Sequence, residues 1–405
     1  MNSRDGGRRA VFSSRFNFPM TPNRWTRALR EARAEGRALL DLAVSNPTAA
    51  GLSWDAGTLA AALAAPEIAR YDPNPRGSPA AREAVAAFYA ETHGARVDPA
   101  EIHLTASTSE AYAWLLKLLC EPGDAVAMPV PSYPLIPFLC RMENTDTREY
   151  ALVRDDARER WTPDFDSLAR AADDPRVKAI FCVNPNNPTG SVFSAEERAR
   201  LEAFARERGL PLVVDEVFLE YMRDGAAAES FATAEGGSVF VLGGLSKTAA
   251  LPQIKAGWIL TRGDADFRRE ATKRLDFVAD TFLSVSTPAQ AALPALLRDA
   301  PAVRERVRAR LDANEARLAA WCARSRDLKL LRREGGWYGV VRLPRGVEEE
   351  SLATDLLRRE GVVAHPGYFY DLECAPAPHL VFSLLAPEAA FDAAFPRLEA
   401  ALLRN

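Results

Sequence analysis

The feature of this sequence that most limits its fold is a regular alternation of short apolar runs with amphipathic stretches from about residue 100 onward. The apolar runs, rich in Val, Ile, Leu and Phe, are residues 125–130, 177–183, 210–218, 238–244 and 256–261. Stretches between them, including residues 109–119 and 194–209, have helical periodicity. Such alternation is typical of a mostly parallel sheet covered by helices on both faces. We therefore expect a three-layer α/β/α domain over residues 46–285.

The chain after this domain follows a different pattern. A long, charged amphipathic helix is expected over residues 301–325, and the sequence ends with a second helix over residues 389–404. Three short strands are expected between them, in GWYGVVRL, GVVAHPG and HLVFSLL. This order predicts a smaller α+β domain over residues 286–405. Residues 1–45 are expected to form an arm and a helix that pack with the smaller domain.

Composition excludes several classes of function. With 405 residues, 48% of them hydrophobic, the chain can bury a large core. A net charge of −4 without a long basic block argues against nucleic acid as a partner. No apolar segment reaches the roughly 18 residues of a membrane span and no secretory h-region is present, so we expect a cytoplasmic protein. The spacing of Cys and His suggests neither a disulfide framework nor a metal site.

Polar residues follow four of the predicted strands, at the edge of the sheet where open α/β proteins bind ligands. These residues are Tyr133, the segment NPNNPTG with Asn187, Asp215, and Ser246 with Lys247. Each has an ordinary explanation as a turn, a cap or a packing residue. Their shared position favours a binding site. Only six of the 51 Lys and Arg residues are lysines. A lysine at position 247 therefore suggests a role that arginine cannot fill.

An anion site is a further hypothesis. Ser107 and Glu110 are spaced as a capping box at the start of a helix, and Ser107, Thr108 and Ser109 place three hydroxyls there. A capped helix and nothing more is the alternative interpretation; a phosphate cradle built from free N–H groups and the helix dipole is the functional one. A Walker phosphate loop around Lys247 is disfavoured, because Ser246 and Val241 occupy the positions where glycine is required.

A lysine, a carboxylate, an aromatic ring and a phosphate cradle form the set that pyridoxal phosphate needs. Lysine is the side chain that forms a Schiff base with an aldehyde, which arginine cannot do. A carboxylate can keep the pyridine nitrogen protonated, so that the ring withdraws electrons from the substrate Cα.

From about residue 40 to the C-terminus the chain resembles the class I and II aminotransferases, which are pyridoxal-phosphate enzymes of fold type I. The resemblance rests on several motifs in this order: YDPNPRGSPAAREAVAAFY (71–89), EPGDAVAMPVPSYP (121–134), NPNNPTG (184–190), VVDEVFLEY (213–221), LSKTAALPQIKAGW (245–258) and AHPGYFY (364–370). It implies a homodimer that moves an amino group between an amino acid and a 2-oxo acid through pyridoxamine phosphate.

The resemblance also implies roles for individual residues. Lys247 would form the Schiff base and move the proton during catalysis. Asp215 would pair with the pyridine nitrogen, Asn187 would donate to the ring oxygen, and Tyr133 would stack on the ring. The remaining cofactor-binding set would be Ser107, Thr108, Ser109, Ser246, Lys255 and, reaching across to the neighbouring subunit, Tyr71.

Three cofactor-site positions depart from the family pattern. Gly244 stands where the family usually has Ser or Thr, and Lys255 where it usually has Arg, which removes a bidentate contact. Phe218 stands where a tyrosine commonly donates to the ring oxygen. We therefore expect the lysine-bound cofactor to lose its proton at a higher pH than is usual in the family.

The fourth departure concerns the substrate. Val381 occupies the position of the arginine that grips the substrate carboxylate in the family, and no arginine occurs between Pro378 and Pro396. Arg333 and Arg342 are candidates for its replacement. The missing contact leaves open a second interpretation, a lyase, decarboxylase or C–C bond-forming enzyme on the same cofactor. A third, a non-catalytic ligand sensor, is disfavoured because both Lys247 and Asp215 are kept.

Overall fold

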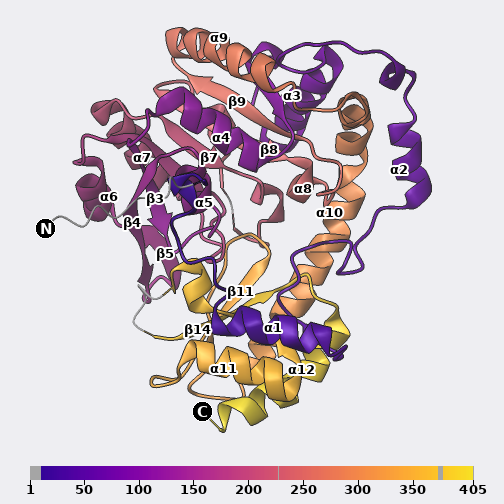
Figure 1. The fold of residues 1–405 in the computed structure, drawn as a ribbon, viewed down its shortest axis with the longest axis vertical. Coiled ribbons are helices and arrows are strands. Elements are labelled where there is room, and N and C mark those ends of the chain that lie inside the picture. The colour runs from indigo at the N-terminus through magenta and orange to yellow at the C-terminus, as the bar shows by residue number, and fades with distance from the viewer. Residues whose placement is uncertain (1–10, 227, 373–376, 405) are drawn as a thin grey trace, which may run out of the picture.

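A computed structural model of the chain describes residues 11–226, 228–372 and 377–404, and an eight-stranded sheet lies at its centre (Figure 1). In spatial order its strands are β2 (Ile102–Thr105), β9 (Gly257–Gly263), β8 (Ser238–Gly244), β7 (Leu212–Asp215), β6 (Val177–Val183), β3 (Ala125–Val130), β4 (Asp146–Asp155) and β5 (Arg160–Pro163). The run from β8 to β4 is parallel; β9 is antiparallel to both of its neighbours, and β5 is antiparallel to β4. The predicted α/β fold with a mostly parallel sheet is confirmed.

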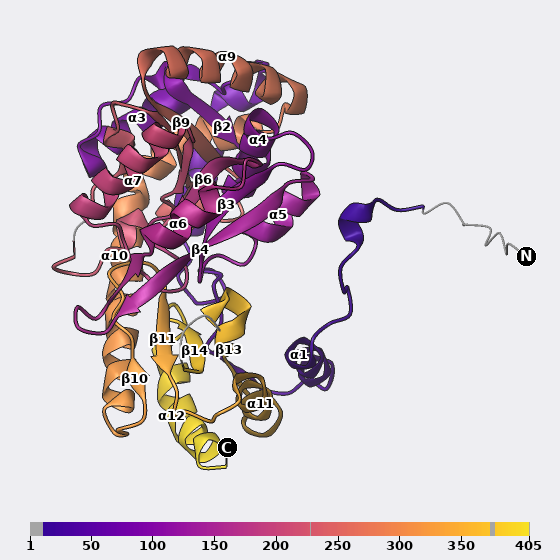
Figure 2. The ribbon, with the colours of Figure 1, turned by 90° about the vertical axis from the view of Figure 1, so that its left-hand side faces the viewer.

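Helices cover both faces of this sheet, because the side chains of each strand alternate between two apolar cores. In β3, Val126 and Met128 belong to one core, while Ala125 and Ala127 belong to the other. The first core is closed by α4 (Thr108–Leu119), α5 (Ile136–Met142) and α9 (Ala265–Phe282). The second is closed by α3 (Pro79–His93), α6 (Phe165–Ala172), α7 (Ala195–Arg208) and the first half of α10 (Thr287–Cys322), and Figure 2 shows the layers from the side.

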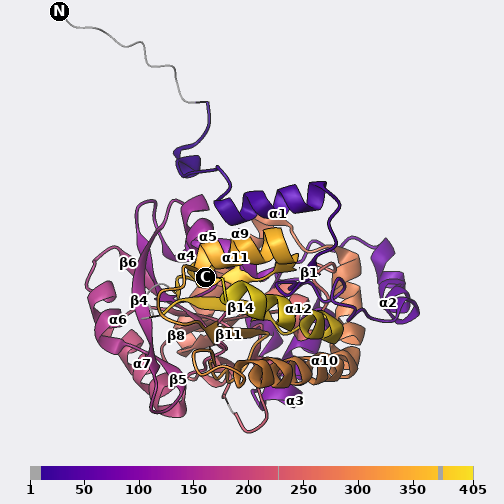
Figure 3. The same cartoon turned by 90° about the horizontal axis from the view of Figure 1, so that it is seen from below.

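A smaller sheet lies below the large one and has its own apolar core. Its antiparallel strands are, in order, β10 (Lys329–Leu330), β11 (Tyr338–Arg342), β14 (His379–Ser383) and β13 (His365–Pro366). The second half of α10, α11 (Glu349–Asp355) and α12 (Glu388–Leu402) pack around it. Seen from below, α1 (Arg24–Ala34) lies alongside α11 (Figure 3), and its Trp25 contacts the rings of His365 and Phe369.

Short elements complete the fold. A two-stranded parallel sheet joins β1 (Leu40–Asp41) to β12 (Val362–Val363), and thereby ties the segment after α1 to the smaller sheet region. The others are α2 (Ala56–Leu63), α8 (Leu245–Thr248), the 3₁₀ turns η1 (Ser14–Phe16), η2 (Pro66–Ala69), η3 (Pro99–Glu101), η4 (Leu219–Tyr221), η5 (Phe231–Thr233) and η7 (Gly367–Tyr370), and the π-helical turn η6 (Leu356–Glu360). None of the helices in the described part of the chain is long and apolar enough to cross a membrane.

Three predicted elements differ clearly from the structure. The single strand expected in GVVAHPG is wrong, because this segment forms β12 and β13, which pair in different sheets. Helix α10 begins at Thr287, so the expected start at residue 301 is wrong, and Pro294 and Pro301 lie inside it. A proline within a helix costs about 3 kcal/mol; here the helix continues because its first half buries an apolar face against α3. Strand β7 ends at Asp215 rather than at residue 218, because the buried residues that follow it turn out of the sheet.

Candidate active site

A cavity of about 250 Å³ opens where the polar loops follow the strands of the large sheet. It brings together most of the residues predicted from the sequence: Ser107, Thr108, Ser109, Tyr133, Asn187, Asp215, Ser246, Lys247 and Lys255. Gly244 and Phe218, which the sequence placed at the cofactor site as departures from the family pattern, also line it. The parts of its wall that were not predicted are Ser45, Val183, Val217, Ala256 and Tyr338. Parallel strands deliver their carboxyl ends to one edge, and this geometry explains why residues far apart in sequence meet here.

Asp215 is a buried carboxylate with neutral hydrogen-bond donors. Its Oδ1 accepts from the Val217 amide at 3.1 Å, and its Oδ2 accepts from the Tyr112 hydroxyl at 3.2 Å. Burial raises the pKa of Asp215 to about 6, although these two donors and the charge of Lys247 act in the opposite direction. A cationic group of a ligand placed beside this buried carboxylate would stabilise its ionised form.

Lys247 lies in the single turn α8, directly after β8. Burial lowers the pKa of Lys247, and the nearby charge of Asp215 opposes that shift. Its Nζ lies 5.1 Å from the centre of the Trp337 ring, a cation–π distance. The backbone carbonyl of Lys247 accepts a 2.6 Å hydrogen bond from the buried Tyr221 hydroxyl, which fixes the turn that carries the amine. The site thus holds a positioned lysine whose pKa is shifted in the direction that favours the nucleophilic amine.

Asn187 and Tyr133 complete the part of the wall that could hold an aromatic cofactor. Asn187 is only 5% exposed, and its Oδ1 has no hydrogen-bond partner among the described residues. A buried amide with unused hydrogen-bonding capacity at a cavity wall is available to a ligand. Tyr133 is half-buried, and its pKa is raised by burial and by the charge of Asp215. These residues fit the ring of pyridoxal phosphate.

The part of the cavity wall at the N-terminus of α4 suits an anion. Ser107 caps α4, and its hydroxyl accepts from the Glu110 amide at 3.2 Å; the Glu110 carboxylate accepts in return from Ala106 rather than from Ser107. The helix dipole and the first-turn amides favour a phosphate at this terminus. Lys255 adds a positive charge, and its backbone φ of +60° is uncommon outside glycine.

Gly244 has a steric reason to lack a side chain. A Cβ at this position would lie 3.1 Å from the Gly257 Cα and 3.2 Å from the Ala256 carbonyl oxygen. Both distances are shorter than ordinary van der Waals contact. The strands β8 and β9 therefore approach each other closely beside the cavity, and serine here would require them to shift.

Comparison with known protein families identifies the family of this chain. A family model described as "Aminotransferase class I and II" matches residues 26–379, most of the chain. The chain belongs to this family. Its members are pyridoxal-phosphate enzymes, and the chain is a transaminase of this class that uses pyridoxal phosphate as its cofactor. The lyase, decarboxylase or C–C bond-forming alternative is not favoured.

Relatives of known name are similar to this aminotransferase over most of their length. The alanine aminotransferase of Mycobacterium tuberculosis is 28% identical over 374 residues, which cover 90% of this chain and 86% of the relative. The glutamate–pyruvate aminotransferase AlaA of Escherichia coli is 28% identical over 298 residues, with 72% of each chain covered. A variant aspartate aminotransferase of Thermus thermophilus has a similar structure, with a TM-score of 0.80 and 26% identity over 97% of this chain and all of the other.

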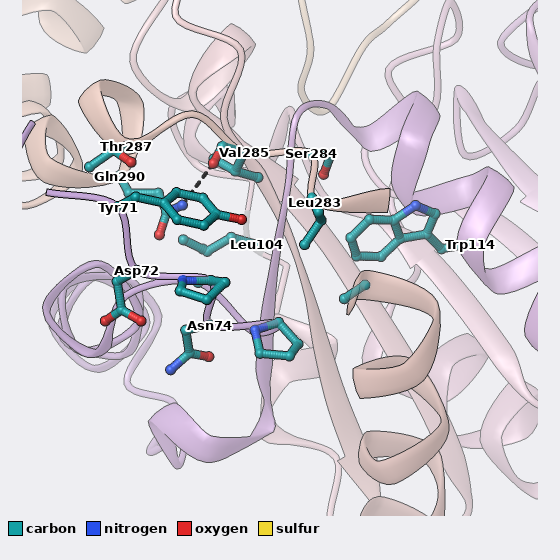
Figure 4. A pocket seen from close by; sticks show the side chains of 14 residues that line it. Tyr71, Asp72, Asn74, Leu104, Trp114, Leu283, Ser284, Val285, Thr287 and Gln290 are labelled. Carbon is teal, nitrogen blue, oxygen red and sulfur yellow. Dashed lines mark hydrogen bonds between the residues drawn. The ribbon is translucent and has the colours of Figure 1, made fainter. Parts of the chain in front are cut away.

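Tyr71 is the predicted site residue that does not line the cavity in the single chain. It is 72% exposed and borders a separate pocket with Asp72, Asn74 and Gln290 (Figure 4). The loop that carries Tyr71 is held in place by Arg76, which forms a bidentate ion pair with a carboxylate of α9. Its position at the surface is what a residue that acts in a neighbouring subunit requires.

The two arginines considered as replacements for the carboxylate-binding arginine lie outside the cavity wall. Arg333 is buried, donates to the Gly336 carbonyl and forms a 2.8 Å ion pair with Glu315. Arg342 lies within 3.8 Å of Asp156 near the surface. Val381 is 1% exposed in β14. The structure therefore does not bring either arginine to the site.

The packing of Phe218 against aromatic residues of the smaller sheet region is the part that sequence reasoning missed. Phe218 is buried and packs edge-on against Trp337 and Tyr338, with ring centres 5.4 and 6.5 Å apart. These two partners come from the region of the smaller sheet, about 120 residues later in the chain. The one signal in the sequence was the aromatic pair in GWYGVV, which predicted a strand but not its contact with the site.

Proposed function

We propose that Lys247 holds the pyridoxal-phosphate aldehyde covalently through its Nζ and that the other residues of this cavity hold the rest of the cofactor. One observation carries the proposal: a lysine with a lowered pKa and a buried carboxylate share a cavity with the N-terminus of α4. When bound, pyridoxal phosphate supplies an electron-withdrawing ring that weakens the bonds at the substrate Cα.

Each residue of the chain has a separate task in this proposal. With the cofactor bound, the Lys247 amine would take the proton from the substrate Cα and deliver it to the carbon that receives the amino group. Asp215 holds a proton at the pyridine nitrogen, a cationic partner for its buried carboxylate. Asn187 donates a hydrogen bond to the ring oxygen, and Tyr133 packs on the ring.

The phosphate would be bound at the N-terminus of α4. Its hydrogen-bond donors would be the hydroxyl and amide groups of Ser107, Thr108, Ser109 and Ser246. Lys255 would supply the positive charge. This arrangement leaves Lys247 and Lys255 with different duties, one covalent and one electrostatic. These residues would keep the cofactor in the cavity while Lys247 is not bonded to it.

The amino donor that we propose is a small amino acid such as alanine or aspartate, with a 2-oxo acid such as 2-oxoglutarate as acceptor. The names of the mycobacterial and Escherichia coli relatives, an alanine and a glutamate–pyruvate aminotransferase, support this choice.

We further propose a cytoplasmic homodimer. Tyr71 and the large apolar residues Phe277 and Leu283 are 72%, 78% and 59% exposed. An exposed apolar group of this kind favours association, and dimerisation would allow Tyr71 of each subunit to reach the phosphate end of the neighbouring cavity. We also propose the division into an arm (1–45), a large domain (46–285) and a small domain (286–405), with α10 packing into both cores.

The test is a spectrophotometric survey of the purified, cofactor-loaded protein against a panel of amino acids. We expect alanine or another small amino acid to convert the absorption of the lysine-bound cofactor to that of pyridoxamine phosphate, with one equivalent of 2-oxo acid formed. Adding a 2-oxo acid should reverse the conversion. Release of ammonia or CO₂ without this conversion would contradict the proposed reaction.

A further inference from the structure

Two polar residues of the cavity wall, Ser45 and Tyr338, belong neither to the large sheet nor to the loops that follow its strands. Tyr338 is the first residue of β11, and Ser45 lies four residues after β1. Their side chains are close enough to interact through their hydroxyl groups. The smaller sheet region therefore contributes a pair of hydroxyl groups to the same cavity that holds Lys247.

Strand β14 fixes this pair in place. Ser383 is the register partner of Tyr338. Its hydroxyl donates to the Val44 carbonyl at 2.5 Å, and its amide donates to the Leu42 carbonyl at 2.7 Å. These bonds hold the segment that leads to Ser45 against β14, directly beside the strand that carries Tyr338. The hydroxyl pair is thus built into the fold and is not a chance approach of two surface groups.

Packing also restricts the Tyr338 ring. Its centre lies 6.5 Å from that of Phe218, with the rings edge-on, and 6.0 Å from that of Tyr370. Burial raises the pKa of Tyr338 to about 12, although the interaction with the Ser45 side chain acts against this shift. The hydroxyl therefore keeps its proton at neutral pH and can donate it in a hydrogen bond.

Both positive charges of the cavity wall have a proposed role in binding the cofactor. Among the described residues that line it, the cationic side chains are Lys247 and Lys255. Arg333 is held by Glu315 away from the cavity. A substrate carboxylate that enters this part of the wall meets hydroxyl donors instead of a guanidinium.

We propose that Tyr338 and Ser45 form the subsite that binds the carboxylate of the amino-acid substrate, through two neutral hydrogen bonds. The inference rests on the function proposed above, because it places an amino acid beside Lys247. Neutral donors bind a carboxylate less strongly than a bidentate arginine and discriminate less against an uncharged carbonyl group. The substrates of such a site are small amino acids and, with comparable efficiency, their carboxamides.

The test uses the variants Tyr338→Phe and Ser45→Ala in the cofactor-loaded enzyme. Binding of propanoate, which has the carboxylate but no amine, is followed by its effect on the cofactor absorption. Losing one neutral hydrogen bond should raise the propanoate Kd and the alanine KM by about 2- to 12-fold, with little change in kcat. In the wild type, kcat/KM for alanine and for alaninamide should agree within about tenfold. If a cationic side chain bound the carboxylate instead, kcat/KM for alanine would exceed that for alaninamide by up to about 150-fold.

Tyr370→Phe is the matched control, since Tyr370 lies next to Tyr338 but its hydroxyl is hydrogen-bonded to the His365 ring at 3.0 Å and it does not line the cavity. It should leave both constants unchanged. Unchanged propanoate binding in both cavity variants, or a preference for alanine over alaninamide above about tenfold, would overturn the subsite. A wild-type protein without lysine-bound cofactor absorption would instead overturn the proposed function, so the two failures are distinguishable.

Discussion

Glu216, the neighbour of Asp215, makes the stability of this aminotransferase depend on pH near neutrality. It is 3% exposed and does not line the cavity. Its carboxylate accepts hydrogen bonds from the Ser230 hydroxyl at 2.5 Å and from the Phe231 amide at 2.7 Å. Burial raises the pKa of Glu216 from its ordinary value of 4.5 to about 7, against the effect of these two donors.

The sign and size of the effect follow from this pKa. The folded state binds the Glu216 proton more tightly than the unfolded state does. The contribution of this proton to the free energy of unfolding is therefore fully present below pH 4.5 and is lost as the pH rises through 7. A difference of about 2.5 pH units corresponds to about 3 kcal/mol. Glutamine cannot ionise and retains an acceptor oxygen, so Glu216→Gln should avoid this loss.

Equilibrium unfolding in urea at several pH values measures the prediction. The stability of the variant relative to the wild type should rise by about 2 kcal/mol between pH 5.5 and pH 8.5. The pKa of Asp215 is also raised by burial, but Asp215 is present in both proteins and its contribution cancels in the difference. The exposed residue Glu235, changed to Gln, gives the same change in net charge and should show no such trend. A difference that stays constant with pH, or a variant less stable at pH 8.5, would refute the reasoning.

Three further predictions concern the cofactor site and the loop of Tyr71. Asp215→Asn should lower kcat by about 10²- to 10³-fold in a steady-state assay while the cofactor stays bound, because a preorganised charge is lost; near-normal kcat would contradict this role. Phe218→Tyr adds a hydroxyl to the cavity wall and should lower the pH midpoint of the lysine-bound cofactor absorption by about one unit, whereas an unchanged midpoint would count against our account of Phe218. Burial opposes ionisation of Asp276, yet hydrogen bonds from Arg76 and His103 hold its pKa well below the ordinary value. Asp276→Asn should therefore cost about 1–2 kcal/mol in urea unfolding at pH 7, an effect that shrinks as the pH falls through the Asp276 pKa and that would be refuted by equal stabilities at pH 7.

The sequence predicted three of the central, buried strands to the residue. The runs 125–130, 177–183 and 238–244 match β3, β6 and β8 because a strand covered on both sides is continuously apolar. Strand β4 (Asp146–Asp155) was not predicted, because it lies towards the sheet edge and alternates charged, exposed residues with buried ones. Strand β2 (Ile102–Thr105) has only four residues, too few for a periodic pattern to be recognised.

The site was predictable to the extent that it depends on local topology. Asn187, Asp215 and Lys247 each follow a buried strand, so their meeting at one edge could be inferred from the strand pattern alone. Ser45 and Tyr338 reach the same cavity through the docking of the smaller sheet and of the segment after β1. Contacts of this kind depend on tertiary packing between distant segments. No pattern in the sequence around Ser45 or Tyr338 predicts that packing.

The central claim is that Lys247 is the residue that binds the cofactor covalently. The chain contains six lysines, Lys117, Lys178, Lys247, Lys255, Lys273 and Lys329, so a peptide map can examine every alternative. Borohydride reduction of the loaded enzyme, followed by mass spectrometry, should place the pyridoxyl group on Lys247 alone, and Lys247→Ala should bind the cofactor without being labelled. Label on Lys255, or a Lys247→Ala protein that keeps the absorption of lysine-bound cofactor, would contradict the account.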